Sequence, residues 1–287
     1  MTAHTDEEST GEPLDHRQDT HAEVATLRAV LDGRWAPLRG EVRDYLATVA
    51  VGDTEQDVAT QRGRTWEALH ALAGTGVPRI GFPAEFGGKD DVGGALTAFE
   101  MLGLGDLSVM VKAGVQWGLF GGAVQLLGTS AHHREYLEKI ISLELPGCFA
   151  MTETGHGSDV ANLATTATFD ADTAEFVLDT PVEAARKDYI GNAARDGRMA
   201  VVFAQLYTQG RSYGVHAFLV PIRDENGRAL PGVRIEDCGA KAGLNGVDNG
   251  RLSFHAVRVA RTALLNRFGD VTADGTYHSD IESDNRR

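Results

Sequence analysis

Ten residues near the middle of the chain combine side chains that could bind a ligand. Residues 150–159 read AMTETGHGSD, an apolar run followed by hydroxyl-bearing side chains and two glycines. Hydroxyl groups of threonine and serine donate and accept hydrogen bonds, and glycine lets a ligand approach the backbone closely. The pattern predicts a β-strand that ends in a binding loop, with Thr152 and Ser158 as hydrogen-bonding groups. A β-turn capped by serine or aspartate accounts for these residues equally well.

A second stretch has the composition of another ligand-facing strand end. Residues 185–194 read ARKDYIGNAA, in which an aromatic and an apolar residue precede Gly191 and Asn192. An aromatic ring such as that of Tyr189 can stack on a flat ligand. The residues alone also fit an ordinary turn with a half-buried tyrosine. Neither stretch is the G-x-G-x-x-G fingerprint of a dinucleotide-binding Rossmann fold, since position 160 is valine.

Together the two stretches resemble the paired flavin-binding loops of the acyl-CoA dehydrogenase and acyl-CoA oxidase family. The second loop of that family is usually written with tryptophans, as in TKWWIGN. Further blocks of the same resemblance follow in order: GVHAFLVPIRD at 214–224, KAGLNGVDNGR at 241–251 and LLNRFGDV at 264–271. The resemblance covers roughly residues 75–287 and is stronger to the oxidases than to the dehydrogenases.

The resemblance implies FAD as the cofactor and assigns roles to six residues. Thr152 matches the threonine that bonds to the flavin ring, and Gly191 matches the residue whose backbone faces the flavin from the other loop. Tyr189 stands where a tryptophan often flanks the isoalloxazine. The cofactor-binding set is therefore Met151, Thr152, Tyr189 and Gly191, and the residues expected near the CoA portion of the substrate are Gly157 and Ser158.

The implied activity is FAD-dependent oxidation of a fatty acyl-CoA to a trans-2-enoyl-CoA, with O2 as acceptor giving H2O2, as in fatty acid β-oxidation. In the family the α-proton is removed by a glutamate from a C-terminal helical domain, which would begin just after Arg287. No catalytic residue is therefore assigned in this chain, and Glu153 is interpreted as a hydrogen-bond acceptor that shapes its loop. The complete protein is expected to be a homodimer.

Two other functions stay open from the sequence. The chain could belong to a dehydrogenase that passes electrons to a carrier protein, or it could be a non-catalytic flavin- or CoA-binding module or a truncated product. It departs from the family pattern where Asp188 and Tyr189 replace two tryptophans and where Ala242 replaces a common methionine. Asp188 would place a carboxylate near a site that should receive anionic ligands.

The elements that must position these loops follow from periodicity. Apolar residues keep a helical spacing from His21 to about Ala73, from 92 to 127 and from 130 to 143, whereas short apolar runs after Pro146 read as strands. We predict an α+β fold, in which an all-α helical domain precedes a small β-barrel and the family's C-terminal helical domain is absent. The predicted parts are a disordered acidic tail at 1–20, a helical domain at 21–145, a β-barrel domain at 146–265 and a connector at 266–287.

Composition narrows the possible partners. The chain has 41 acidic residues against 27 lysines and arginines, a balance that argues against nucleic acid as a partner. Its two cysteines are far apart, which argues against a disulfide or zinc site, and His132 and His133 are expected on a solvated helix face, with no metal bound. No apolar run approaches the roughly 18 residues of a membrane span, and the chain carries no recognisable targeting signal. A cytoplasmic location is therefore expected.

Overall fold

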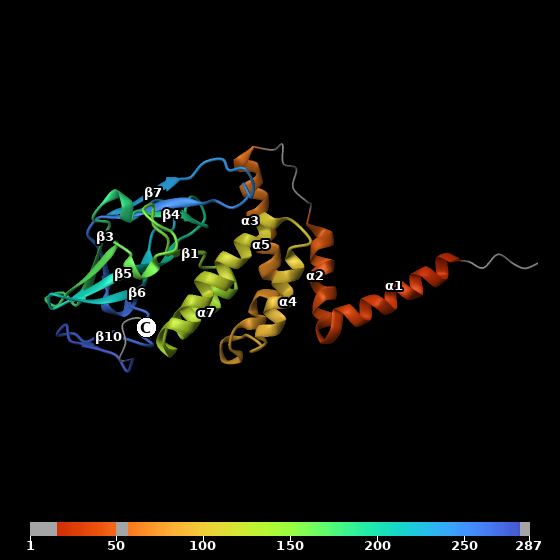
Figure 1. Ribbon diagram of the computed structural model, residues 1–287, viewed down its shortest axis with the longest axis horizontal. Coiled ribbons are helices and arrows are strands. Elements are labelled where there is room, and N and C mark those ends of the chain that lie inside the picture. Colours follow the sequence, from red (N-terminus) through yellow and green to blue (C-terminus); the bar gives the residue numbers. More distant parts are fainter. Residues whose placement is uncertain (1–15, 50–56, 282–287) are drawn as a thin grey trace, which may run out of the picture.

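The computed structural model describes residues 16–49 and 57–281, and helices fill the first half of this part (Figure 1). The α-helices are α1 (His16–Asp32), α2 (Ala36–Thr48), α3 (Val58–Thr75), α4 (Val92–Leu102), α5 (Leu107–Ala113), α6 (Gly122–Leu127) and α7 (Ser130–Ile141). A π helix, η4 (Gly114–Gly121), joins α5 to α6, and two 3-10 turns, η2 (Val77–Gly81) and η3 (Ala84–Phe86), separate α3 from α4. The long helical segment predicted at 92–127 is therefore divided in two, α4 and the continuous run of α5, η4 and α6.

The amino-terminal helix begins earlier than the sequence pattern predicted. Residues 1–15 of the predicted acidic tail lie outside the described residues, whereas residues 16–20 already belong to α1. This helix extends away from the body of the molecule (Figure 1). The Arg43 guanidinium holds its last residue, Asp32, through an ion pair of 2.6 Å. The predicted tail is thus too long by one turn of helix.

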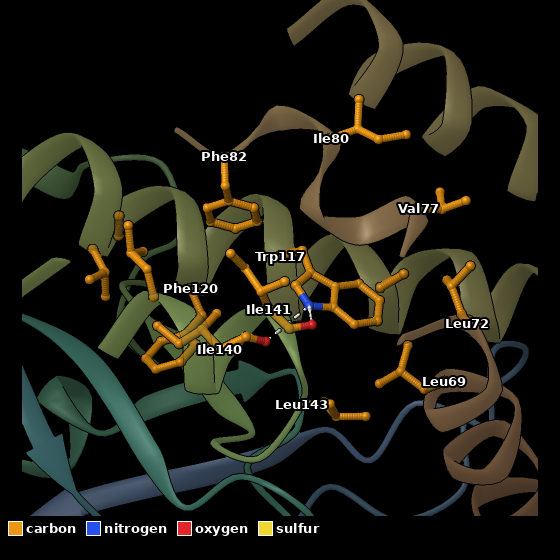
Figure 2. Close-up of a cluster of buried hydrophobic side chains, with 14 of the residues drawn as sticks. Leu69, Leu72, Val77, Ile80, Phe82, Trp117, Phe120, Ile140, Ile141 and Leu143 are labelled. Atoms are coloured by element: carbon orange, nitrogen blue, oxygen red, sulfur yellow. Dashed lines mark hydrogen bonds between the residues drawn. The ribbon is translucent and has the colours of Figure 1, made fainter. Parts of the chain in front are cut away.

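The core of the helical region is built around Trp117 of the π helix (Figure 2). Its indole Nε1 donates to the carbonyls of Ile140 and Ile141 at 3.0 and 3.2 Å, near the end of α7. These bonds satisfy carbonyls that a helix end leaves without intrahelical partners. Buried side chains from α3, η4, α7 and the segment after η2 belong to the same cluster, among them Leu69, Leu72, Phe82 and Phe120. Tertiary packing of these apolar side chains therefore holds the short helices in place.

One continuous helical segment, Leu107–Leu127, is apolar and long enough to cross a membrane, which corrects the sequence-based statement that no such run exists. It has 21 residues, and more than half of it is buried inside the structure. Burial on this scale is typical of the central helix of a helical core, because such a helix is apolar on most sides.

The second half of the described chain is made of strands. They are β1 (Gly147–Ala150), β2 (Thr166–Asp170), β3 (Glu175–Asp179), β4 (Lys187–Ile190), β5 (Met199–Thr208), β6 (Arg211–Pro221), β7 (Val233–Asp237), β8 (Gly250–Phe254), β9 (Val257–Ala260), β10 (Asp270–Val271) and β11 (Tyr277–His278). A six-stranded sheet has the order β1-β5-β2-β3-β9, and its sixth strand, β6, also pairs with β5. Strands β1 and β2 pair with successive parts of β5, whereas β6 pairs along most of its length. Strands β4-β8-β7 form a three-stranded sheet, and β10 and β11 pair with each other.

Strand β5 joins the helical and β regions, because its two faces belong to different cores. Val201 and Phe203 lie in the cluster with the helices, whereas Ala200, Val202 and Ala204 lie in the cluster inside the β region. Alternation along a strand sends successive side chains to opposite faces, so β5 is buried on both. The predicted fold class is confirmed: a helical region precedes a curled β region, and β1 carries the first candidate loop away from the shared sheet (Figure 1).

Candidate functional site

The two stretches singled out in the sequence lie side by side. The Thr152 hydroxyl donates to the Asp188 carbonyl at 2.9 Å, and the Asp188 amide donates back to the Thr152 carbonyl at 3.1 Å. One step further along, the Thr154 amide donates to the Arg186 carbonyl at 2.8 Å. We call residues 151–158, which follow β1, and residues 188–194, at the end of β4, the paired loops. Their backbones are thus fixed relative to each other by direct hydrogen bonds.

A buried carboxylate shapes the first of the paired loops. Glu153 is 4% exposed and accepts hydrogen bonds from the amides of Ala164 and Thr165 at 2.8 and 2.9 Å, and from the Thr165 hydroxyl at 2.6 Å. Burial alone would raise its pKa, but the Lys187 ammonium and these hydrogen bonds outweigh burial, so the pKa of Glu153 lies below its ordinary value. The predicted role of Glu153 as a loop-shaping acceptor is confirmed.

The partner of Glu153 is a lysine in the second strand of the site. Lys187 is fully buried, and its Nζ lies 3.0 Å from Glu153 Oε1. The same ammonium donates to the carbonyls of Met151 at 3.0 Å and Phe203 at 2.8 Å. Burial lowers the pKa of Lys187 to about 8, although the Glu153 carboxylate favours the charged form. One side chain therefore ties together β4, β5 and the start of the first loop.

Tyr189 presents an aromatic ring at the rim of the paired loops. Its side chain is 62% exposed, and its backbone has φ of +55°, in the left-handed region that is uncommon for a bulky residue. The pairing of β4 with β8 is irregular at this point, as in a β-bulge. The Asn249 side chain donates to the Tyr189 carbonyl at 2.9 Å and supports this conformation. A strained backbone held by its surroundings is frequent at binding sites.

The Asp188 carboxylate is neutralised by the protein. The Arg251 guanidinium lies 2.9 Å from Asp188 Oδ1, the Thr154 hydroxyl donates to Oδ2 at 3.1 Å, and the Tyr189 amide donates to Oδ1 at 2.9 Å. The Arg251 guanidinium thus balances the negative charge of Asp188, which the sequence analysis expected beside a site for anionic ligands. The Asp188 carboxylate therefore joins the two loops through its hydrogen bonds with Thr154 and Tyr189.

Gly191 brings the second loop against the π helix. A Cβ at this position would lie 2.8 Å from the Val115 side chain, so any larger residue would push the loop away from η4. The next residue, Asn192, is buried with φ of +66°, and its Nδ2 donates to the Gly147 carbonyl at 2.8 Å. The second loop is therefore fixed both to the π helix and to the beginning of β1.

An apolar cavity of about 740 Å³ opens on the helical side of this contact. Side chains of α4, η4 and α6 form its walls, and Val115, which packs against Gly191, is one of them. Gly118 also lines the cavity, and a Cβ built on it would meet nothing within 4 Å. Val115 thus links the cavity wall to the second loop. The space is suited to an apolar chain rather than to a polar group.

The remaining predicted site residues lie along the first loop. Met151 is half-buried beside the helical core, and Thr152 is half-buried at the contact with the second loop. Within the described residues, the Thr152 amide donates to no protein group. Gly157 and Ser158 are exposed, at the end of the loop away from β1. The structure therefore brings Thr152, Tyr189 and Gly191 onto adjoining segments, with Gly157 and Ser158 further out.

Two histidines differ from their predicted setting. His132 is buried at 6% exposure, where it forms a capping box with Thr129 and its Nε2 lies 3.0 Å from the Thr262 carbonyl. His133 Nε2 lies 3.0 Å from the Gln125 carbonyl. The prediction of a solvated helix face was wrong because both rings satisfy backbone groups. Among residues 16–49 and 57–281, no group of three or more His, Cys, Asp and Glu side chains could hold a metal ion.

Sequence reasoning missed a charged residue that contacts this site from the helical side. Lys112 of α5 is fully buried and pairs with Asp196 and Asp248 from the β region. A signal for it exists, since Lys112 is the single charged residue in the apolar segment 107–127. A buried charge is retained only where it has partners.

Comparison with known proteins agrees with this geometry. Residues 36–144 match the family model described as acyl-CoA dehydrogenase, N-terminal domain, and residues 148–257 match the acyl-CoA dehydrogenase, middle domain. Acyl-coenzyme A oxidase 2, peroxisomal, of Arabidopsis thaliana is 52% identical over 205 residues, which are 69% of this chain and 30% of that protein. The chain therefore spans about a third of the length of such relatives.

Solved structures of acyl-CoA oxidases share the fold. Acyl-CoA oxidase 3 from Yarrowia lipolytica superposes with a TM-score of 0.76 at 32% identity, over 86% of this chain and 35% of that one. Acyl-CoA oxidase 1 of Caenorhabditis elegans, complexed with FAD and ATP, gives a TM-score of 0.72 at 33% identity, over 91% of this chain and 39% of that one.

These relatives also correct one expectation. Several of them carry the word peroxisomal in their names, so the predicted cytoplasmic location is wrong. The predicted family is confirmed, since both domain models match in the expected order and the similar proteins are oxidases. This chain belongs to the acyl-CoA dehydrogenase and oxidase family and carries its N-terminal and middle domains.

Proposed function

We propose that the paired loops hold the isoalloxazine ring of FAD and that the chain forms part of an acyl-CoA oxidase. The observation that carries this proposal is the direct hydrogen bonding between Thr152 and Asp188, which places both loops at one site beside the exposed ring of Tyr189. In support, a similar oxidase from Caenorhabditis elegans is described as complexed with FAD.

The groups available at the paired loops suit a flavin. The Thr152 amide is free to donate, and its hydroxyl oxygen, which donates to Asp188, keeps lone pairs that can accept. The Tyr189 ring offers a flat surface for stacking. Gly191 has no side chain, so Val115 of η4 packs directly against the second loop. We assign Met151, Thr152, Tyr189 and Gly191 to the cofactor.

When bound, FAD would supply the electron-accepting ring for oxidation of the α and β carbons of a fatty acyl-CoA to the trans-2-enoyl-CoA. The residues of this chain would orient the ring and the acyl chain and would exclude water from them. Thr152 and Gly191 fix the edge of the ring, while the apolar cavity beyond Val115 receives the acyl chain. We assign Gly157 and Ser158, which are exposed, to the CoA portion of the substrate, and we assign no catalytic residue among the described residues.

Several finer points belong to the same proposal. We propose O2 as the electron acceptor, giving H2O2, because the similar proteins are oxidases rather than dehydrogenases that use a carrier protein. The peroxisome is the proposed location, and a homodimer is the proposed assembly of the whole protein. We propose a helical domain at 21–145 and a β domain at 146–265. The segment predicted as a connector at 266–287 packs against the β domain in its described part, since Val271 is buried in the β core and the Thr208 hydroxyl donates to the Gly275 carbonyl.

The test of this proposal is binding of acyl-CoA to the FAD-loaded chain. Binding is monitored through the visible absorption of the flavin. We expect a saturable spectral change with a long-chain acyl-CoA and none with free CoA. Gly118→Leu provides the matched variant, because Gly118 lines the cavity and a Cβ at this position meets nothing within 4 Å. It should weaken the long-chain response and leave FAD affinity unchanged. A chain that binds FAD and ignores acyl-CoA would instead be a non-catalytic flavin-binding module.

A further inference from the structure

A buried ammonium connects the helical region to the second of the paired loops. Lys112 of α5 is 0% exposed, and its Nζ lies 2.8 Å from Asp196 Oδ2 and donates to Asp248 Oδ1. Asp248 is also 0% exposed. A buried charge without a partner is strongly destabilising. The three side chains therefore depend on one another, and they come from α5, from the turn after Gly191 and from the segment before β8.

The Asp248 carboxylate holds the backbone of that turn. The Asp248 Oδ2 atom accepts from the amides of Arg195 at 2.8 Å and Asp196 at 3.0 Å. The backbone carbonyl of Asp248 accepts from the Ala194 amide at 3.1 Å. Three successive amides are thus directed at one residue. The Lys112 ammonium compensates the carboxylate that makes this arrangement possible.

A second cation holds the carbonyls of the same turn from the other side. Arg223 is 8% exposed and donates to the carbonyls of Gly197 at 2.8 Å, Ala193 at 2.7 Å and Ala194 at 2.8 Å. Burial lowers the pKa of Arg223, although nearby anionic groups favour its charged form. The backbone of the turn at 193–197 is therefore held through its amides by Asp248 and through its carbonyls by Arg223. Gly191 and Tyr189 lie immediately before it.

We propose that Lys112 is a positioning residue for the flavin-facing loop: it fixes Asp248, which in turn fixes the backbone from Ala194 to Asp196 and so sets the place of Gly191 and Tyr189. This inference rests on the proposed function, because the loop is assigned to FAD there. It differs from a general stabilising role, because Lys112 acts on a segment that directly continues the binding loop.

A neighbouring ion pair provides the matched control. Arg62 of α3 forms a bidentate pair with Asp237 of β7 at 2.5 and 2.8 Å, so it also joins the helical region to the β region. Its guanidinium donates to none of the carbonyls of the 193–197 turn in the part of the chain described, and the bond of 3.0 Å from the Arg195 side chain ends on the Arg62 backbone carbonyl, which the substitution keeps. Arg62→Met therefore removes a comparable link between the two regions without releasing the turn.

The experiment compares the unchanged chain with Lys112→Met, with the double variant Lys112→Met/Asp248→Asn and with Arg62→Met. FAD affinity is measured by quenching of flavin fluorescence, the environment of the ring by visible circular dichroism, and stability by thermal unfolding of each protein. The double variant removes the charges of Lys112 and Asp248 and leaves Asp196 paired with the Arg195 guanidinium at 2.7 Å. It keeps a side-chain oxygen at 248 that can accept from the Arg195 and Asp196 amides.

We expect Lys112→Met to weaken FAD binding about tenfold and to alter the visible circular dichroism below its melting temperature. The double variant should recover most of the FAD affinity and most of the visible circular dichroism spectrum. Arg62→Met should have a lower melting temperature with unchanged FAD affinity and spectrum. If all variants bind FAD as the unchanged chain does, the positioning role of Lys112 is overturned while the flavin site stands. Should Arg62→Met alter the spectrum as much as Lys112→Met, a merely structural role would explain both. If the unchanged chain binds no FAD, the proposed function itself fails.

Discussion

The Lys187 ammonium lies 3.0 Å from Glu153 Oε1, and both side chains are buried where the paired loops meet β5. Removal of one partner would leave the other charge buried without compensation, which costs about 3–5 kcal/mol. We therefore expect Lys187→Met to lower the free energy of unfolding by that amount, measured by urea denaturation. The double variant Lys187→Met/Glu153→Gln should be more stable than the single one. A Lys187→Met protein as stable as the unchanged chain would show that the pair contributes little.

The lowered pKa of Glu153 predicts a loss of stability in acid. Because the folded-state pKa lies below the unfolded value of about 4.3, the unfolded chain binds more protons as the pH falls. The stabilisation is complete above the unfolded value and disappears as the pH falls through the folded value. The melting temperature should decline less steeply between about pH 5 and pH 3 in Glu153→Gln than in the unchanged chain. Parallel curves for the two proteins would contradict this.

Thr152 offers a test of the first loop. Thr152→Val removes the hydroxyl that donates to the Asp188 carbonyl and would accept from the ring, and one such hydrogen bond contributes about 1 kcal/mol. We expect FAD binding weakened by about fivefold, measured by fluorescence titration. Thr152→Ser keeps the hydroxyl and should bind FAD as the unchanged chain does. Equal affinity in the valine and serine variants would remove Thr152 from the site.

Tyr189 permits a prediction in which stability and binding separate. Its ring is 62% exposed and its φ is +55°, so glycine would lose little packing and would relieve backbone strain. Tyr189→Gly should change the free energy of unfolding by less than about 1 kcal/mol, yet weaken FAD binding because the stacking surface is gone. Tyr189→Trp should bind at least as tightly as the unchanged chain. A loss of stability without a loss of affinity in Tyr189→Gly would mean that the ring serves the fold alone.

Local signals in the sequence predicted much of this fold. The apolar runs at 200–204 and 214–220 predicted strands, and they lie within β5 and β6. Glycines and hydroxyl-bearing residues predicted the loop after β1. The end of strand β4 before Gly191 was predicted, but the burial of Lys187 within that strand was not, because only its distant partners explain it.

The same limit explains what was missed around the candidate site. Lys112 and Asp248 lie 136 positions apart, and no local pattern links them. The π helix at Gly114–Gly121 reads in the sequence as an ordinary apolar helix rich in glycine. His132 was expected in solvent because its capping role depends on Thr129 and on the distant Thr262. The order of the family blocks, rather than any physical pattern, revealed the paired loops as one site.

The central claim is that residues near Thr152 and Gly191 jointly hold a flavin, and titration of FAD with the purified chain tests it most directly. The account predicts saturable, one-to-one quenching of flavin fluorescence that weakens in Thr152→Val and in Tyr189→Gly but not in Thr152→Ser. Absence of saturable quenching by a chain that unfolds cooperatively, or quenching that none of these variants alters, would contradict it.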